Sequence, residues 1–270
     1  MTNNVPARIV SPALLEFRGV TVYKNERKVL DSLSLTIGEG ENVAILGPNG
    51  AGKSSFIKTI NREFYPVLDA GDVTFAIRGS PVWDVFELRS TIGIVSNDLQ
   101  NTFNRGITGN EVILSGYFSS IGLFNRRVSC GMQEKADELM EFLEIGALKD
   151  RKMNEMSSGE ARRFLIGRAL VNDPATLILD EPTNSLDLHA LHCFRTVLRK
   201  IARSGTGIIL VTHNLYDIIP EISRVILMKD GKFCNDGAKE RILTERTIGE
   251  LFNVKVRVHT ENGYYYATGF

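Results

Sequence analysis

The 270-residue chain is long enough for one α/β domain with an inserted lobe, and its 43% apolar residues can fill a substantial core. Lysine plus arginine and aspartate plus glutamate both number 32, so no net charge favours strong binding to nucleic acid or to an anionic membrane. The 3 cysteines, Cys130, Cys193 and Cys234, have no metal-ligand spacing, and we expect them to be buried thiols in a reducing compartment.

The first part of the chain has the alternating pattern of half-buried strands. Apolar residues recur mostly at every second position, at Leu15, Phe17, Val20 and Val22 and again at Leu33, Leu35 and Ile37. This pattern predicts an opening antiparallel sheet. Other runs are short and nearly continuously apolar, as in parallel strands covered on both faces: 42–46, 91–95, 176–180 and 207–211. Because helix-prone segments alternate with these runs, we expect an α/β core.

The run 42–46 leads into a phosphate-binding loop. Residues 47–54 read Gly-Pro-Asn-Gly-Ala-Gly-Lys-Ser, which matches G-x-x-x-x-G-K-[ST] in front of a helix-prone segment, 54–61. Glycines let successive N–H groups converge on phosphate oxygens, and the start of the helix adds a positive dipole end. Lys53 is placed to reach the β- and γ-phosphates, and the Ser54 hydroxyl is a Mg²⁺ ligand. We therefore expect a Mg²⁺–nucleoside triphosphate here, rather than a ligand-free turn, bound by Gly47, Pro48, Asn49, Gly50, Ala51, Gly52, Lys53, Ser54 and Ser55.

The middle of the chain changes to a helical pattern. Helices are expected at 108–118, 133–143 and 160–171, so we interpret about 98–172 as an inserted helical lobe. In front of the third helix, Ser157 and Glu160 form an S-x-x-E capping box. A capped helix N-terminus is also an anion site, because its hydroxyl, N–H groups and dipole point the same way. The two interpretations are compatible.

Acidic and histidine side chains follow two of the buried runs. Asp180 and Glu181 end the run 176–180, at the sheet edge where ligands of open parallel sheets bind. We expect Asp180 to hold Mg²⁺ and Glu181 to orient and deprotonate a water, although acids that merely end a strand are the alternative. His213 follows the run 207–211 and can donate to a γ-phosphate oxygen.

The last part of the chain returns to strands and short helices. Strands are expected at 225–228 and 232–234, helices at 239–243 and 248–252, and a final edge strand pair within 254–268. No internal repeat is present, so the chain contains a single nucleotide-binding unit.

These motifs have the order and spacing of the ATP-binding cassette (ABC) ATPases, and residues 14–236 resemble one such domain. The motifs are the loop 47–54, Met156-Ser-Ser-Gly-Glu160, Leu177-Ile-Leu-Asp-Glu181, Ser185-Leu-Asp187 and His213. The resemblance implies an α/β P-loop NTPase with a RecA-like parallel-sheet core, an N-terminal antiparallel β subdomain and an inserted α-helical subdomain. It also implies an ATPase that uses ATP and Mg²⁺, with 237–270 as a C-terminal extension of helices and strands.

In that family two cassettes pack head to tail, and each ATP lies between the P-loop of one subunit and the signature motif of the other. The resemblance thus implies a second copy of this chain, or another ABC cassette, as partner. Ser157, Ser158, Gly159 and Glu160 would complete the opposite site, and Asp187 would cross the interface. Tyr23 would stack on the adenine, although it also fits an aromatic at a strand end.

The sequence departs from the family pattern at two places. The signature usually reads Leu-Ser-Gly-Gly-Gln, whereas Ser158 and Glu160 stand here, and the added carboxylate near phosphate predicts slower turnover. The family also has a glutamine near the metal just after the run 91–95. This chain has the shorter Asn97 there, with Gln100 close behind, and either residue is a candidate for that role.

Transporter ATPases of this family receive a helix of a membrane subunit on the helical lobe. The matching region is apolar, and it is either the core of the lobe or a docking surface: Val112, Ile113, Leu114, Tyr117, Phe118, Ile121, Leu123 and Phe124. The segments 94–100 and 113–124 are similar to a subgroup that includes molybdate-import and photorepair ATPases.

The leading prediction is a cytoplasmic ATPase subunit that associates with transmembrane permease subunits at the inner face of the cell membrane. The alternative is a soluble ABC ATPase with a regulatory or mechanical role on ribosomes or DNA. A single cassette without a long coiled-coil insertion favours transport. A binding module without turnover is disfavoured by Glu181 and His213.

Overall fold

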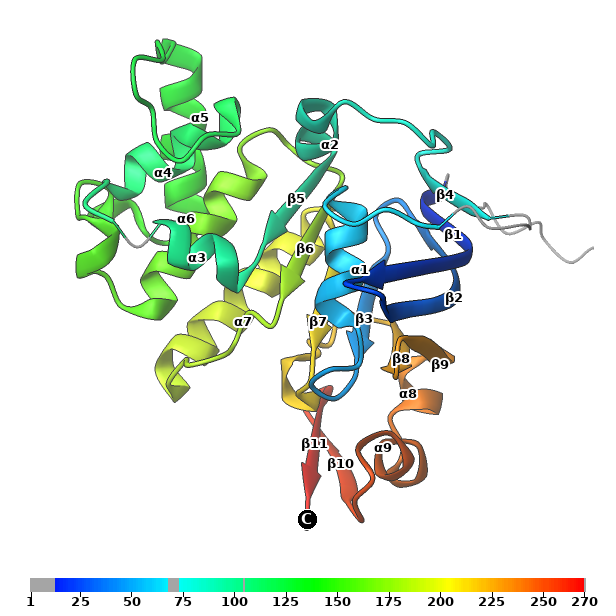
Figure 1. Cartoon of the computed structure of the whole chain (residues 1–270). Coiled ribbons are helices and arrows are strands. Elements are labelled where there is room, and N and C mark those ends of the chain that lie inside the picture. The colour runs from blue at the N-terminus through cyan, green and yellow to red at the C-terminus, as the bar shows by residue number, and fades with distance from the viewer. Residues whose placement is uncertain (1–12, 68–72, 104, 270) are drawn as a thin grey trace, which may run out of the picture.

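The computed structural model describes residues 13–67, 73–103 and 105–269, and a six-stranded sheet forms its centre (Figure 1). The strand order is β5 (Ile92–Val95), β6 (Thr176–Asp180), β7 (Gly207–Thr212), β3 (Asn42–Leu46), β8 (Arg224–Lys229) and β9 (Lys232–Ala238). Neighbours from β5 to β8 run parallel, and β9 pairs antiparallel with β8. The predicted buried runs are therefore confirmed as parallel strands.

The central strands separate two hydrophobic cores. Ala44 and Leu46 of β3 face one core, whereas Val43 and Ile45 face the other. The first core is filled mainly by the helices α4 (Gly109–Ser115), α5 (Cys130–Phe142), α6 (Ser158–Leu170) and α7 (Leu188–Arg203), and the second by α1 (Lys53–Ile60) and the N-terminal strands. Because a strand between two cores has no solvent side, its sequence is continuously apolar.

The N-terminal strands form an antiparallel sheet of their own, in the order β2 (Arg27–Gly38), β1 (Ala13–Lys24), β4 (Thr74–Ile77). All the residues predicted to face inward are buried, from Leu15 at 0% exposure to Leu35 at 5%, so the alternating pattern is confirmed. Strand β4 is missing from the sequence predictions, because it is only 4 residues long and too short to show a clear period.

The predicted helices of the middle segment lie together on one side of the main sheet, away from the N-terminal sheet (Figure 1). The helices between β4 and β6 are α2 (Val85–Thr91), α3 (Asn97–Phe103), α4, η1 (Gly116–Phe118), α5, η2 (Gly146–Leu148), η3 (Met153–Glu155) and α6. The helix predicted at 108–118 is α4 continued by the 3₁₀ turn η1. Capping decides where α5 and α6 begin, because Ser129 and Ser157 accept bonds from the first turn of each helix.

Helix α7 has 16 residues and is missing from the sequence predictions. Asp187 caps its start, and Phe194, Val197, Leu198 and Ile201 form the buried face at helical spacing. Most of the remaining positions are polar or charged, so only one narrow stripe signals the helix. In the part of the chain that the structure describes, no helix is both long and apolar enough to cross a bilayer.

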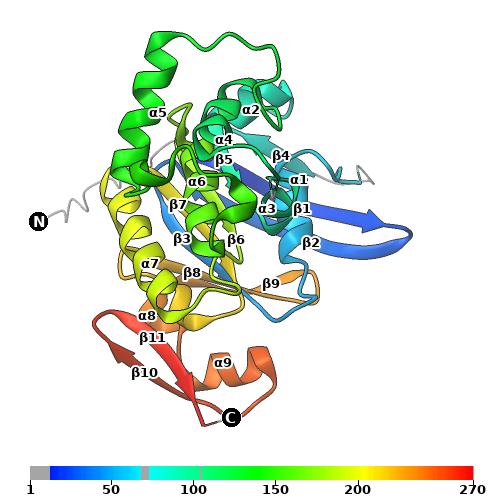
Figure 2. The same cartoon turned by 90° about the vertical axis from the view of Figure 1, so that its left-hand side faces the viewer.

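The C-terminal part packs below the main sheet (Figure 2). It comprises η4 (Leu215–Asp217), which follows β7, and then α8 (Lys239–Ile242), α9 (Glu245–Phe252), β10 (Arg257–Glu261) and β11 (Tyr264–Thr268). The predicted helices and strand pair are present. The pair is a two-stranded sheet of its own, however, and does not extend the edge of the main sheet. Its strand β11 contacts η4.

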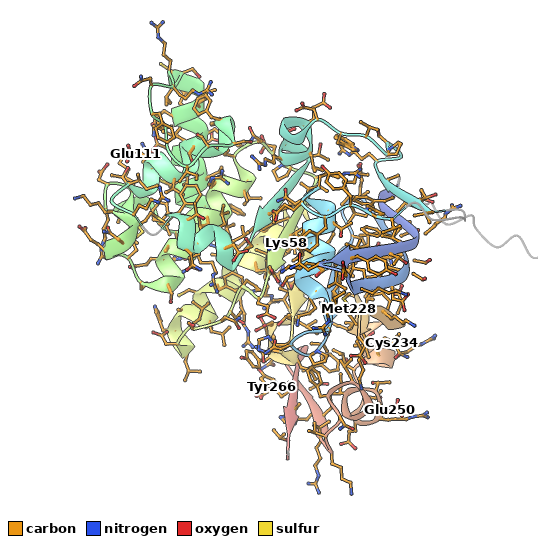
Figure 3. All side chains as sticks on the ribbon, in the orientation of Figure 1. Lys58, Glu111, Met228, Cys234, Glu250 and Tyr266 are labelled. Carbon is orange, nitrogen blue, oxygen red and sulfur yellow. The ribbon has the colours of Figure 1, made fainter. Side chains whose placement is uncertain are left out.

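The expectation of buried cysteines is wrong. Cys130 and Cys234 are exposed, Cys193 is half-buried, and all are free thiols. Cys130 is the first residue of α5, where the helix end is open to water, and Cys234 lies on β9, the edge strand of the main sheet (Figure 3). Exposure at a helix start or a sheet edge depends on the tertiary arrangement, so residue type alone is a poor guide.

Two leucines of α7 give a matched test of its packing. Leu198 is 0% exposed and Leu188 is 87% exposed. Leu198→Ala should lower the free energy of unfolding by about 2–5 kcal/mol, because it leaves a cavity between α7 and the sheet. Leu188→Ala should change it by less than about 0.5 kcal/mol. Urea unfolding of both variants checks this expectation, and equal losses would contradict the packing of α7.

Candidate nucleotide-binding site

Neighbouring strand ends bring the predicted site together. β7 lies between β3 and β6, and all these strands run parallel, so their carboxyl ends meet at one edge. The backbone N–H of Gly47 donates to the Thr212 oxygen at 3.2 Å, and that of Glu181 donates to the Val211 oxygen at 2.8 Å. The phosphate loop and the candidate base are thus both tied to the strand that ends before His213.

The loop between β3 and α1 closes around the Lys53 side chain. Gly52 has a φ of 106°, which favours glycine, and a Cβ there would come within 2.9 Å of Met228 Cε (labelled in Figure 3). Lys53 is only 5% exposed, and its Nζ donates to the carbonyl oxygens of Gly47 at 2.8 Å and Pro48 at 3.0 Å. The loop therefore holds a buried ammonium at its centre.

Glu181 is the meeting point of the candidate catalytic groups. Its Oε1 lies 3.2 Å from Lys53 Nζ and 3.2 Å from His213 Nδ1, and its Oε2 accepts a bond from Asn184 Nδ2 at 2.8 Å. Burial raises the pKa of Glu181, but the Asn184 bond, the charge of Lys53 and the contact with His213 outweigh it, so the net pKa lies below its usual range. The Glu181 carboxylate is therefore ionised near neutral pH, as a general base requires.

The neighbouring Asp180 has the opposite electrostatic environment. Burial, and then the charge of Glu181, raise the pKa of Asp180 to about 6, although Lys53 and a hydrogen bond with Ser54 act against this. Its Oδ1 is buried and has no hydrogen-bond partner. A buried carboxylate oxygen beside a serine hydroxyl fits a hard cation such as Mg²⁺, which typically takes one or two protein oxygens together with substrate phosphates.

A cavity of about 1050 Å³ opens beside the loop, which is large enough for a nucleotide. Its lining includes Asn49, Gly50, Gly52, Lys53, Ser54, Ser55, Asp180 and Glu181. The β1–β2 hairpin supplies Lys24, Arg27 and Lys28, which the sequence analysis missed. The sequence signal that could have found them is a group of cations around one hairpin in a chain without net charge. Tyr23 is on the same hairpin and 46% exposed, but it is outside the cavity lining.

The two candidates for the glutamine role differ in what the structure says of them. The side chain of Asn97, the first residue of α3, lies outside the described part of the structure. Gln100 is not part of the cavity lining. Its Oε1 instead accepts bonds from Arg162 Nε at 3.1 Å and Nη2 at 2.7 Å.

The predicted signature residues are apart from this cavity. Ser157 caps α6, and the capping box is confirmed: Glu160 Oε2 accepts from the Ser157 N–H at 2.8 Å, and Ser157 Oγ accepts from the Glu160 N–H at 3.3 Å. Burial raises the pKa of Glu160, but the Ser157 bonds and Arg151 outweigh it and keep the pKa low. Ser158 Oγ donates to the Ser185 oxygen at 3.2 Å. The exposed Ser157 and Asp187 are thus free to meet another molecule, whereas Gly159 is buried.

Comparison with known proteins decides the family. Residues 30–184 match the family model described as ABC transporter. The chain belongs to the ABC transporter family. The uncharacterized ABC transporter ATP-binding protein YlmA of Bacillus subtilis (strain 168) is 31% identical over 250 residues, which cover 91% of this chain and 93% of YlmA.

Solved structures of ABC proteins have the same fold. CbiO1 of Clostridium perfringens, part of the ABC transporter complex cbiONQ, is 26% identical with a TM-score of 0.71, over 90% of this chain and 95% of CbiO1. A dimeric bacterial ABC transporter cassette is 27% identical with a TM-score of 0.68, over 83% and 98% of the two chains.

These findings confirm the predicted α/β P-loop NTPase and the prediction of an ABC transporter ATPase subunit. The ABC family hydrolyses ATP, so this chain is an ATP-binding and ATP-hydrolysing subunit of a transporter, and the ribosome or DNA alternative is not supported.

The apolar region predicted as lobe core or docking surface has a buried part and an exposed part. Val112, Ile113 and Leu114 on α4 are buried in the first core, with exposures of 0%, 0% and 2%. Beyond η1 the chain turns outward, and Ile121 is 41% and Phe124 82% exposed. The first part is therefore core of the lobe, and the second leaves apolar side chains open to solvent.

The raised pKa of Asp180 predicts a pH-dependent stability. Below about pH 4, Asp180 is protonated in both the folded and the unfolded protein, so its burial does not lower the free energy of unfolding. As pH rises through about 6, the buried side chain must ionise, and the free energy of unfolding falls. Asp180→Asn should therefore raise the free energy of unfolding at pH 7.5 by about 2 kcal/mol and leave it nearly unchanged at pH 4. Urea unfolding of the nucleotide-free protein at both pH values is the measurement. Asp150→Asn, at an exposed position, is the control, and equal pH slopes for wild type and Asp180→Asn would refute the assignment.

Proposed function

We propose that Lys53, Glu181 and His213 carry out ATP hydrolysis in this transporter subunit. The observation that supports this most directly is the position of Glu181 Oε1, which is 3.2 Å from both Lys53 Nζ and His213 Nδ1. A base, a phosphate-binding cation and a second donor thus converge beside a nucleotide-sized cavity. Chains that only bind nucleotide need no such base.

The geometry suggests a division of roles. Lys53 exchanges its loop carbonyls for phosphate oxygens, and the N–H groups of 47–55 neutralise the phosphate charge. Glu181 accepts a proton from the water that attacks the γ-phosphorus, the bond to the bridging oxygen breaks, and ADP leaves. His213 donates to the γ-phosphate and stabilises the charge that develops there.

Ser54 and Asp180 are the residues that would hold Mg²⁺. When bound, the ion would neutralise charge on the phosphate oxygens. In the described residues, no group of 3 or more histidine, cysteine, aspartate or glutamate side chains forms a metal site by itself. This agrees with a cation that takes its other ligands from the substrate. Asn97 and Gln100 are both candidates for the remaining metal-side role, and Gln100 would have to leave Arg162 to fill it.

A second cassette would complete each nucleotide site. Ser157, Ser158, Gly159 and Glu160 stand away from the cavity at the start of α6, and Asp187 and Leu188 are exposed nearby on α7. This placement supports a head-to-tail dimer in which one protomer's signature serine faces its partner's γ-phosphate. Tyr23, exposed on the hairpin beside the cavity, is placed to cover an adenine.

The proposal also covers the domain boundaries and the location of the protein in the cell. We assign residues 14–236 to the ATPase domain, about 98–172 to its helical subdomain and 237–270 to a C-terminal extension. Ile121 and Phe124 form the surface that would contact a transmembrane permease subunit. The protein would then be cytoplasmic and held at the inner face of the membrane by that subunit.

Replacement of the base tests the catalytic assignment. Glu181→Gln keeps the side-chain shape but removes the proton acceptor, so hydrolysis should fall by about 100-fold or more while ATP still binds. Phosphate release and ATP titration measure the two effects. Lys53→Ala is the contrasting variant, because loss of the loop cation should abolish binding itself. Unchanged phosphate release by Glu181→Gln would remove Glu181 from this role.

A bulky signature residue tests the composite site. Ser157→Arg should prevent ATP-driven dimerisation, measured by light scattering in the Glu181→Gln background, and leave ATP binding by the monomer intact. The substitution also removes a helix cap, so Ser129→Arg, which removes the equivalent cap of α5, is the control. Normal dimers of the Ser157 variant would contradict the proposed interface.

A further inference from the structure

The short segment after the candidate base is held from two sides by buried charges. Pro182 and Thr183 are buried, and Asn184 is half-buried. Glu181 in front of them and Ser185 behind them have positive φ angles of 47° and 65°, an unfavourable conformation for residues other than glycine. A backbone in this conformation persists only where its surroundings fix it, so the contacts of 182–184 determine where Glu181 lies.

Arg162 of α6 holds the segment from the signature side. Its side chain is 4% exposed, and its Nη1 donates to the carbonyl oxygens of Pro182 and, at 3.3 Å, of Asn184. The same guanidinium holds Gln100 of α3. A planar guanidinium presents several N–H donors in fixed directions, which suits acceptors on two elements better than the single nitrogen of a lysine ammonium.

Asp217 of η4 holds the segment from the histidine side. It is 2% exposed, and its Oδ1 accepts a bond from Thr183 Oγ1 at 2.7 Å. Its Oδ2 accepts from Thr212 Oγ1, and that oxygen in turn accepts the Asn214 N–H at 3.0 Å. Asp217 thereby fixes the residue on each side of His213 as well as the segment after Glu181.

The clamped segment contacts the base directly, through the 2.8 Å bond from Asn184 Nδ2 to Glu181 Oε2. Burial lowers the pKa of Arg162 to about 10, against the charge of Asp217, and burial raises the pKa of Asp217. Buried charges are unfavourable for stability when an apolar pair of similar volume would pack as well. Their bonds to consecutive residues of one catalytic loop give these charges a role beyond packing.

We propose that Arg162 and Asp217 are positioning residues that clamp 182–184 and thereby set the orientation of the Glu181 carboxylate. This inference rests on the proposed role of Glu181 as base. Arg162 is on the same helix as Ser157, so the clamp also couples the signature motif of a subunit to that subunit's own base.

Paired arginine variants test the clamp in the full-length protein. Arg162→Met should lower kcat for ATP hydrolysis by about 10–100-fold, because small displacements of a reacting group have effects of this size. The ATP dissociation constant should stay within about twofold, since Arg162 does not line the cavity. Arg163→Met is the matched control, because Arg163 is the next residue of α6 and donates to the carbonyl oxygens of Leu143 and Glu144 instead. Asp217→Asn should lower kcat in the same way as Arg162→Met.

The split between kcat and ATP affinity separates positioning from general destabilisation. If the clamp is lost, kcat should fall while the ATP dissociation constant stays within about twofold, because Arg162 does not line the cavity. An ATP affinity that falls in parallel with kcat, or an unchanged kcat, overturns the proposal. Melting temperatures verify folding, and where Arg162→Met does not fold, Arg162→Lys is judged by the same criteria.

Combination with Glu181→Gln distinguishes the two levels of the proposal. In that background Arg162→Met should cause no further loss of hydrolysis, because the positioned group is already gone. Full activity of Glu181→Gln alone would refute the role of Glu181 and, with it, the clamp. An inactive Glu181→Gln together with a fully active Arg162→Met would refute only the clamp.

Discussion

The whole site depends on the contact between the Lys53 ammonium and the Glu181 carboxylate, 3.2 Å apart. This pair can form only because β3, β7 and β6 are parallel neighbours whose carboxyl ends meet at one sheet edge. The phosphate loop and the base come from segments far apart in the sequence, and each is bonded to β7. The two hydrophobic cores pack on the two faces of the sheet and thereby hold these strand ends in fixed positions relative to one another.

Because of this contact, the nucleotide enters a site that is already ordered. Lys53 is buried, and its Nζ is held by two carbonyl oxygens and a carboxylate. A free lysine side chain loses on the order of 2 kcal/mol of conformational freedom when it is fixed, and here folding has already fixed it. In the proposed site, phosphate oxygens would exchange with existing partners of Lys53, and preorganisation of this kind favours binding.

The sequence predicted the parts of this arrangement that depend on residues close together in the chain. The loop 47–54, the capping box of Ser157 and Glu160 and the buried runs were predictable, because each depends on a fixed spacing within a few residues. The cations of the β1–β2 hairpin, the clamp of Arg162 and the exposed Cys234 were not, because they depend on which elements pack together. The helix α7 lies between these cases: its cap and its stripe were readable, but its polar faces obscured them.

The adjacent carboxylates Asp180 and Glu181 show why residue type alone cannot assign chemistry. One is enclosed at the end of its strand, which raises its pKa to about 6, and the other turns toward a lysine, a histidine and an amide, which lower its pKa. Where neighbouring acids are driven apart in this way, the one with the lower pKa is ionised and suited to accept a proton. The other keeps its proton up to about pH 6, so metal binding at Asp180 below that pH would release a proton and link the site to pH. The backbone has a positive φ at Glu181, and this change of direction separates the two environments.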